Sequence, residues 1–168
     1  MVAIIDYDAG NIRSVEKALR HIGGSCMVTR DPKAILSADR VILPGVGSFA
    51  DAMQHLSDYE LIPVIKEVVA KEIPFLGICL GLQLLFEDSE ESPGVKGLSL
   101  LNGHIRALPK ESGLKIPHIG WNSLSFPREV RLFYGLPEGV YQYFVHSYYL
   151  EAADPSIVTA TTQYGATV

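Results

Sequence analysis

Short, uninterrupted apolar runs alternate with amphipathic stretches in the first half of the sequence. Such runs are typical of strands that are buried on both faces of a parallel sheet. They lie at 2–6, 25–29, 40–43 and 75–78. Because strands and helices alternate along this half, the sequence predicts parallel strands joined by crossover connections.

Three amphipathic stretches predict helices. The first follows Asn11, a residue that can cap a helix, and it ends at Gly23. Apolar residues recur at helical spacing within it, with charged residues on the other side. The second and third are expected at 60–71 and 80–86.

The pattern changes after residue 87. Residues 88–97 are acidic and rich in Ser, Pro and Gly, which predicts an exposed loop. Residues 98–108 are apolar around Asn102-Gly103, a dipeptide that favours a hairpin turn. Further short strands are expected at 119–126, 141–146 and 157–162, followed by a turn at 163–165. The predicted fold class is α/β, with a mostly parallel, helix-flanked half and a β-rich half within one domain.

Composition narrows the possible function classes. The chain has 168 residues, 48% of them apolar, with a net charge of −5, which excludes a disordered or collagen-like protein. It shows no basic run that would bind nucleic acid and no apolar run of about 20 residues that would span a membrane. The start does not resemble a signal peptide, and two cysteines fit a reducing compartment, so we expect a cytoplasmic protein. No His, Cys, Asp and Glu spacing indicates a metal site.

The strongest chemical signal is the segment 77–81, Gly-Ile-Cys-Leu-Gly, which joins a predicted strand to a predicted helix. A nucleophile on such a strained turn needs small neighbours. A helix N-terminus favours the Cys79 thiolate, and the Leu80 N–H would face a substrate oxyanion. The alternative is a buried structural cysteine between packing glycines. The two glycines favour a nucleophile at Cys79, whereas Cys26, in mid-strand, is expected in the core.

A glycine-rich segment, Pro-Gly-Val-Gly-Ser-Phe, follows the run 40–43 and occupies residues 44–49. Sites in open α/β sheets form beyond the carboxyl ends of the strands, so this segment is expected beside Cys79. Its glycines permit close backbone approach and would supply a second oxyanion donor. The alternative is a connection without a role, and the segment does not have the form of a phosphate-binding motif.

Two aromatic segments of the second half contain histidine. The segment 143–149, Tyr-Phe-Val-His-Ser-Tyr-Tyr, either offers polar groups to a ligand or packs in the core, and the residue types leave both open. The segment 117–122, Pro-His-Ile-Gly-Trp-Asn, contains the only Trp. This mixture suits a partner interface, although a packed loop is the simpler interpretation.

Together these segments resemble the class I glutamine amidotransferases, and among them the glutaminase subunits of imidazole glycerol phosphate synthase. The Gly-x-Cys-x-Gly turn is shared by the whole class, whereas Pro-Gly-Val-Gly and Pro-His-x-Gly-Trp-Asn are more specific. The other matching pieces are Ile5-Asp6-Tyr7, Gly10-Asn11, 74–81 with Gln83, and 145–148. The resemblance implies an open, mostly parallel, flavodoxin-like sheet with an added antiparallel, β-rich second half.

The resemblance also implies a mechanism. Cys79 attacks the side-chain amide of glutamine, which gives a thioester and ammonia, and no cofactor is needed. The implied oxyanion donors are Val46, Gly47 and Leu80. The implied contacts to the amino-acid end of glutamine are Gln83, His146, Ser147 and Tyr148.

A heterodimer partner is implied as well. It is a (β/α)₈ cyclase subunit that receives the ammonia and makes imidazole glycerol phosphate and an aminoimidazole carboxamide ribotide in histidine biosynthesis. The residues expected to lie toward it are Asn11, His118, Ile119, Trp121 and Tyr143.

The chain departs from the family near its C-terminus. Family members carry a catalytic histidine and glutamate in a segment like Gln-Phe-His-Pro-Glu, and this sequence stops at Val168, where that segment should begin. We therefore expect a single amidotransferase domain over 1–168 that is truncated and inactive alone. Read without the family, His146 would be the base for Cys79, but the resemblance gives that position to substrate recognition.

Two rival functions stay open. One is a non-catalytic form that binds the cyclase or glutamine. The other is a different α/β cysteine hydrolase, which needs an acid and then a histidine after the nucleophile turn. Only His104, His118 and His146 follow Cys79, which fits that second alternative poorly.

Overall fold

The computed structural model describes residues 1–8, 11–110 and 113–168, so Gly10 of the Gly10-Asn11 motif lies outside the described residues. The chain divides into two compact units, Met1–Leu101 and Asn102–Val168. The assignment of the whole chain to one amidotransferase domain stays a prediction.

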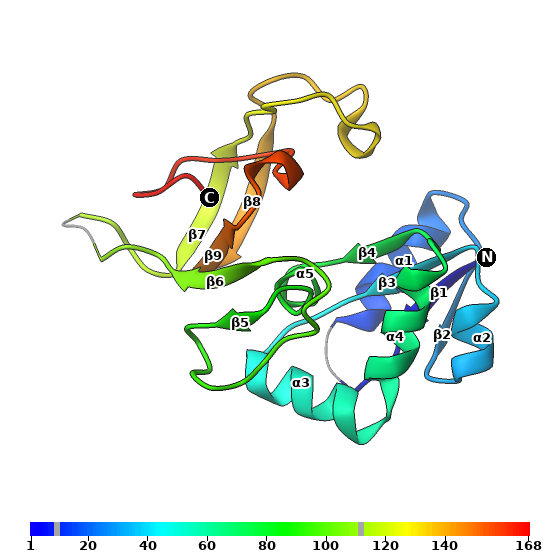
Figure 1. Ribbon diagram of the computed structural model, residues 1–168. Helices are drawn as coiled ribbons and strands as arrows, with labels where there is room; N and C mark the ends of the chain where they lie inside the picture. The colour runs from blue at the N-terminus through cyan, green and yellow to red at the C-terminus, as the bar shows by residue number, and fades with distance from the viewer. Residues whose placement is uncertain (9–10, 111–112) are drawn as a thin grey trace. The chain divides into compact units, whose positions relative to one another are not determined.

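Four parallel strands form the sheet of the first unit, in the order β2-β1-β3-β4 (Figure 1). They are β1 (Val2–Ile5), β2 (Cys26–Thr29), β3 (Arg40–Leu43) and β4 (Phe75–Gly77). All four apolar runs are therefore confirmed as strands. The inner strands β1 and β3 are buried, but β2 and β4 are edge strands on which Val28 and Leu76 are exposed, so their predicted burial on both faces is wrong. Because it lies on the edge strand β2, Cys26 is only half-buried, and its expected place in the core is also wrong.

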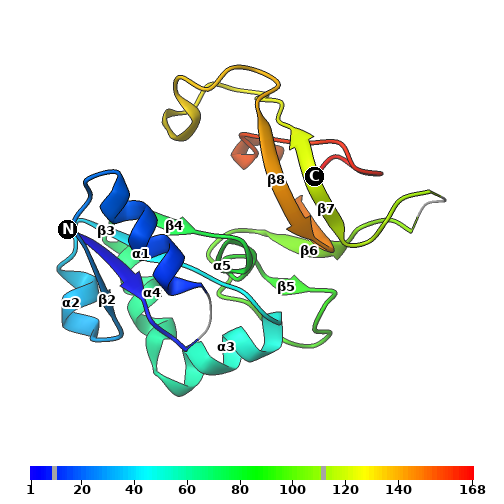
Figure 2. The same cartoon turned by 180° about the vertical axis from the view of Figure 1, so that it is seen from behind.

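Five helices accompany this sheet among the described residues. They are α1 (Ile12–His21), α2 (Pro32–Leu36), α3 (Phe49–Asp58), α4 (Leu61–Ala70) and α5 (Leu80–Gln83). Helix α1 covers one face of the sheet and α4 the other (Figures 1 and 2). The helices predicted after Asn11 and at 60–71 are confirmed, and the one predicted at 80–86 ends early, at Gln83.

Helices α2 and α3 are additions to the predicted set. The Asp31 carboxylate caps α2 by accepting from the N–H groups of Lys33 and Ala34. The Ser48 hydroxyl caps α3 by accepting from the Asp51 N–H at 3.2 Å. The buried face of α3 has helical spacing, with Phe49, Ala52, Met53 and Leu56 directed inward.

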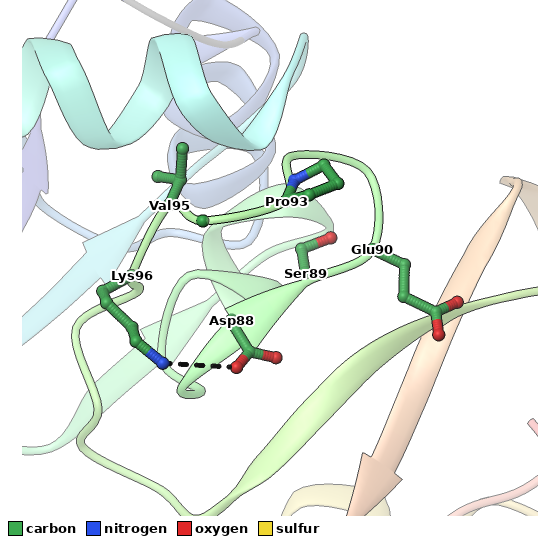
Figure 3. Close-up of a pocket in the computed structure, with 7 residues that line it drawn as sticks. Asp88, Ser89, Glu90, Pro93, Val95 and Lys96 are labelled. Carbon is green, nitrogen blue, oxygen red and sulfur yellow. Dashed lines mark ion pairs between the residues drawn. The ribbon is translucent and has the colours of Figure 1, made fainter.

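The acidic loop after Phe86 also serves α3. Its short strand β5 (Asp88–Ser89) bridges to Lys96, whose ammonium pairs with the Asp88 carboxylate at 3.5 Å (Figure 3). Between these ends, Glu91 accepts from the Phe49 N–H at 2.8 Å and Ser92 from the Ala50 N–H at 3.2 Å. The loop is therefore not only an exposed connection, because it satisfies the first N–H groups of a helix.

The second unit contains two antiparallel pairs. Strand β6 (Gly103–Ala107) pairs with β9 (Tyr148–Ala152), and β7 (His118–Ser123) pairs with β8 (Tyr141–His146). Two short 3₁₀ turns, η1 (Arg131–Phe133) and η2 (Pro155–Ile157), lie between and after them. The strands expected near 119–126 and at 141–146 and the turn near 163–165 are confirmed.

Two expectations for this unit are wrong. Asn102-Gly103 does not turn a hairpin, because Gly103 opens β6 and pairs with Ala152. A Cβ at Gly103 would lie 2.6 Å from the Glu151 carbonyl oxygen, so this glycine permits close strand approach instead. The strand expected at 157–162 is replaced by η2 and a single bridge between Thr161 and Ser125.

Within the described parts of the chain, no helix combines the length and apolar character needed to cross a membrane. The same residues contain no group of three or more His, Cys, Asp or Glu side chains that could hold a metal ion.

Candidate active site

Cys79 sits between the end of β4 and the start of α5 in an unusual backbone conformation. Its φ is +55° and its ψ is −118°, a region that residues with a side chain rarely occupy. Such a conformation costs about 1–3 kcal/mol and persists only where the surroundings enforce it. The side chain is exposed, so the alternative of a buried structural cysteine does not hold.

Glycines on both sides of Cys79 allow this turn to form. A Cβ added to Gly77 would lie 2.6 Å from the Gly81 carbonyl oxygen. A Cβ added to Gly81 would lie 2.0 Å from the carbonyl oxygen of Leu43, at the end of β3. Both distances are too short for any side chain, so the start of α5 packs backbone-to-backbone against the end of β3.

The segment 44–49 lies beside this turn, as its place after β3 predicts. A Cβ on Gly45 would be 2.4 Å from the Gly81 nitrogen and 2.9 Å from the Leu80 Cβ. Gly45 is buried, whereas the next two residues, Val46 and Gly47, are exposed. Gly47 has φ +98°, a conformation that favours glycine.

Several backbone donors at the turn are unused. Among hydrogen bonds between described residues, none is donated by the N–H of Val46, Gly47 or Leu80. Preorganised N–H groups without protein partners are the arrangement that stabilises an oxyanion. The fold therefore brings the two predicted donor segments together at the cysteine.

The helix that follows Cys79 is shorter than the sequence predicts. Because α5 spans only Leu80–Gln83, few peptide dipoles are aligned behind the sulfur, and their support for a thiolate is small. Gln83 lies four residues after Cys79 and is half-buried. The Gln83 N–H donates to the Cys79 carbonyl oxygen at 3.2 Å, which places Gln83 one turn after the nucleophile.

Tyr7 is a member of this site that the sequence left without a role. It follows β1, is fully buried, and donates its hydroxyl proton to the Pro44 carbonyl oxygen at 2.6 Å. Burial raises the pKa of Tyr7 to about 12, with a smaller contribution from the negative charge of Cys79. The sequence gives two signals for it, its place in the matching piece Ile5-Asp6-Tyr7 and a polar aromatic residue directly after a predicted buried strand.

The second unit contains a histidine pair across the β7–β8 ladder. The Nδ1 atom of His146 lies 2.9 Å from the Tyr148 carbonyl oxygen, and its Nε2 atom lies 2.9 Å from His118 Nδ1. Because a carbonyl only accepts, neutral His146 donates from Nδ1 and accepts at Nε2. Both ring nitrogens are occupied, which leaves neutral His146 poorly suited to act as a base.

His118 is separated from the other residues expected at a partner interface. It is buried and stacks on Tyr164 with ring centroids 3.8 Å apart. Burial, with a smaller effect of His146, lowers the pKa of His118, so its ring is neutral near pH 7. Its side chain therefore serves the packing of the second unit and does not lie on an exposed surface.

The other face of the β7–β8 pair is apolar and exposed. Trp121 is 69% exposed and Tyr143 is 55% exposed, and their rings meet edge to face with centroids 5.6 Å apart. Their neighbours Ile119 and Val145 are a directly opposed pair and are also exposed. We call the set Ile119, Trp121, Tyr141, Tyr143 and Val145 the aromatic face.

Asn11 is exposed at the start of α1. Its side-chain oxygen accepts from the Ser14 hydroxyl at 2.7 Å and does not cap a helix N–H, although the residue occupies the predicted capping position. Ser147 joins β8 to β9, and its carbonyl oxygen accepts from the Leu108 N–H at 2.9 Å.

Comparison with known proteins gives consistent matches. The family model Glutamine amidotransferase class-I matches residues 3–168. The "Imidazole glycerol phosphate synthase subunit HisH" of Moorella thermoacetica is 53% identical over 98% of this chain and 77% of its own length. The subunit HisH 1 of Methanococcus maripaludis is 46% identical over 98% of this chain and 82% of its own. A solved glutamine amidotransferase, 16% identical, shares the fold with a TM-score of 0.74 over 96% of this chain and 80% of its own.

The exposure of Cys79 predicts selective alkylation. Limiting iodoacetamide should label Cys79 about tenfold faster than Cys26, because Cys26 is half-buried with its sulfur 3.9 Å from the Glu16 carbonyl oxygen. Mass spectrometry of the digested protein measures the ratio, and urea-unfolded protein, in which both thiols react alike, is the control. Preferential labelling of Cys26 would contradict the assignment.

The strained backbone at Cys79 predicts that glycine there is more stabilising than alanine, the reverse of the usual order. Cys79→Gly should be more stable than Cys79→Ala by about 1 kcal/mol, because relief of strain exceeds the usual entropic cost of glycine. Urea unfolding measures this difference. At Cys26, in an ordinary strand, the order should reverse, with Cys26→Ala the more stable variant. The same order at both positions would show that the turn stores no strain.

Proposed function

The chain belongs to the class I glutamine amidotransferase family, and we propose that it serves as the glutaminase subunit of an imidazole glycerol phosphate synthase. The family match confirms the resemblance inferred from the motifs and the amidotransferase type of enzyme. The relationship to HisH subunits at about half identity supports a role in histidine biosynthesis. The observation that carries the proposed chemistry is the exposed, strained Cys79 beside unused backbone N–H groups.

In the proposed reaction the Cys79 sulfur attacks the side-chain carbonyl carbon of glutamine. The carbonyl oxygen becomes an oxyanion that accepts hydrogen bonds from Leu80 and from Val46 or Gly47. Collapse of this tetrahedral species breaks the carbon–nitrogen bond, and the leaving nitrogen departs as ammonia with the proton that the Cys79 thiol gave up on attack. Water then cleaves the thioester to glutamate and regenerates the thiol.

Glutamine also needs contacts at its amino-acid end. Gln83 supports this role through its position one helical turn after the nucleophile. We assign the remaining contacts to Ser147 and Tyr148, with His146 holding the segment through its bond to the Tyr148 carbonyl. His146 would thus act in recognition by fixing its neighbours, since its ring nitrogens already have partners.

The proposed partner is a (β/α)₈ cyclase, and the aromatic face is the surface that would meet it. Large exposed apolar side chains in one cluster are typical of interfaces, and Trp and Tyr contribute strongly there. Free ammonia is mostly protonated near neutral pH and is then not a nucleophile. Transfer inside a closed interface keeps it neutral, which supports a partner that consumes it. Exposed Asn11 stays a proposed contact, whereas the buried His118 side chain does not.

Loss of the nucleophile should abolish turnover with glutamine but not turnover with added ammonium salt in the assembled complex. With a segment like Gln-Phe-His-Pro-Glu appended to both proteins, Cys79→Ser should lower glutamine-dependent turnover on the order of 10³-fold or more, since a hydroxyl is a far weaker nucleophile than a thiolate. Turnover supported by added ammonium salt should be unchanged, because it bypasses this subunit. Cys26→Ser is the matched control and should retain glutamine-dependent activity. Equal loss in both serine variants would contradict the role of Cys79.

Removal of the central aromatic residue should weaken assembly. Trp121→Ala should cost about 2 kcal/mol of binding free energy, roughly a thirtyfold rise in Kd, because exposed tryptophans are frequent interface anchors. Titration calorimetry against the cyclase measures the effect, with circular dichroism as the folding control. Tyr134→Ala removes another exposed ring, outside the aromatic face, and should leave Kd unchanged. Equal effects of the two variants would remove Trp121 from the interface.

A further inference from the structure

The segment that supplies the proposed oxyanion donors is fixed at both ends and free in the middle. At its far end, Glu91 and Ser92 accept from the Phe49 and Ala50 N–H groups. At its near end, the Pro44 carbonyl oxygen accepts from the Tyr7 hydroxyl. Between these anchors, Val46 and Gly47 are exposed, and their N–H groups have no partner among the described residues.

The near anchor arises from strand register. In the parallel β1–β3 pair Val2 lies opposite Arg40 and Ile4 opposite Ile42. Continuing this offset of 38 residues brings Tyr7 level with Gly45, next to Pro44. The tyrosine side chain therefore reaches the neighbouring strand end without distorting the sheet, and the whole residue is buried.

The Tyr7–Pro44 bond constrains one peptide plane. A trans peptide holds its C=O and N–H antiparallel, so fixing the Pro44 carbonyl also fixes the direction of the Gly45 N–H and the path into Val46. Pro44 is itself buried, so within its surroundings the tyrosine hydroxyl takes the place of water as the donor. Gly45 packs on Leu80 and Gly81, so a rotation of this plane would change the spacing between the two donor segments.

We propose that Tyr7 is a positioning residue for the glutaminase reaction, and that its hydroxyl holds the 44–47 segment in the orientation that presents the Val46 and Gly47 N–H groups to the oxyanion. This inference rests on the proposed function, because it assumes that Cys79 forms a tetrahedral species. Tyr7 touches no reacting atom and acts only through the Pro44 carbonyl. Burial raises the pKa of Tyr7 to about 12, so the hydroxyl keeps the proton that it donates near pH 7.

The test compares Tyr7→Phe with wild type in the assembled complex, with Tyr59→Phe as the matched control. Tyr59→Phe likewise removes a hydroxyl hydrogen bond, but this bond goes to Asp8 and not to the 44–47 segment, and the Tyr59 ring lies against the Arg30 guanidinium. For Tyr7→Phe we expect kcat for glutamine to fall about tenfold with KM within about twofold, because a misplaced donor acts only on the transition state. Alkylation of Cys79 by iodoacetamide, which forms no oxyanion, should keep its rate. Tyr59→Phe should match wild type.

Three results would overturn the proposal. Unchanged kcat in folded Tyr7→Phe excludes a positioning role. A parallel loss of kcat and alkylation rate shows that Tyr7 supports the thiol and not the donor segment. A parallel change of kcat and KM shows a general structural effect. If wild type lacks glutaminase activity that depends on Cys79, the proposed function fails first, and the Cys79→Ser comparison identifies that case.

A second variant keeps the proposal testable if Tyr7→Phe does not fold. Trifluorotyrosine placed at position 7 keeps the hydroxyl but ionises several pH units lower than tyrosine. A phenolate cannot donate, so kcat should fall as pH rises through the pKa of this phenol. In wild type kcat should show no such fall over this pH range, because the pKa of Tyr7 is about 12. Cys79 is the titratable group whose charge acts on Tyr7, and it is the same in both proteins, so their difference reports on the phenol at position 7. The same dependence of kcat on pH in both proteins would refute the proposal.

Discussion

The backbone contact between Gly81 and Leu43 is the constraint on which the site depends. With only 2.0 Å between the Leu43 oxygen and the place of a Cβ, the start of α5 can approach β3 at this position only as glycine. That approach holds Cys79 in its left-handed conformation and brings Gly45 against Leu80. Exposure of the thiol, closeness of the donor segment and strain in the turn are thus three results of one packing contact.

Much of the first unit follows from its sequence, since buried parallel strands produce continuous apolar runs. Cys79 and the 44–49 segment were also predictable, because ligands bind at the carboxyl ends of such strands. Helix α3 was missed although its signals were present, with Ser48 as the cap and buried residues at helical spacing. The glycine-rich segment directly before α3 predicts a loop, and that local signal conceals the start of the helix.

The remaining features depend on partners distant in sequence. The Tyr7 hydroxyl donates to Pro44, 37 positions away, and His118 bonds His146, 28 positions away. A local sequence pattern cannot predict either hydrogen bond. Asn102-Gly103 predicts a local hairpin turn, but Gly103 instead pairs with β9, about 50 residues later in the sequence. The alternation of side chains along a strand explains the two faces of the β7–β8 pair. It directs His118 inward and both Ile119 and Trp121 outward.

The cap on α3 has a consequence for anion selectivity. A strand, a glycine-rich turn and a helix N-terminus in succession form the usual cradle for phosphate. Here the Glu91 carboxylate and the hydroxyls of Ser48 and Ser92 already occupy the first N–H groups of that helix. A permanent anion such as phosphate or sulfate would have to displace a covalently tethered carboxylate and would be repelled by its charge. The start of α3 therefore offers no open cradle for phosphate, and the free donors beside Cys79 lie on the preceding turn and on Leu80 instead.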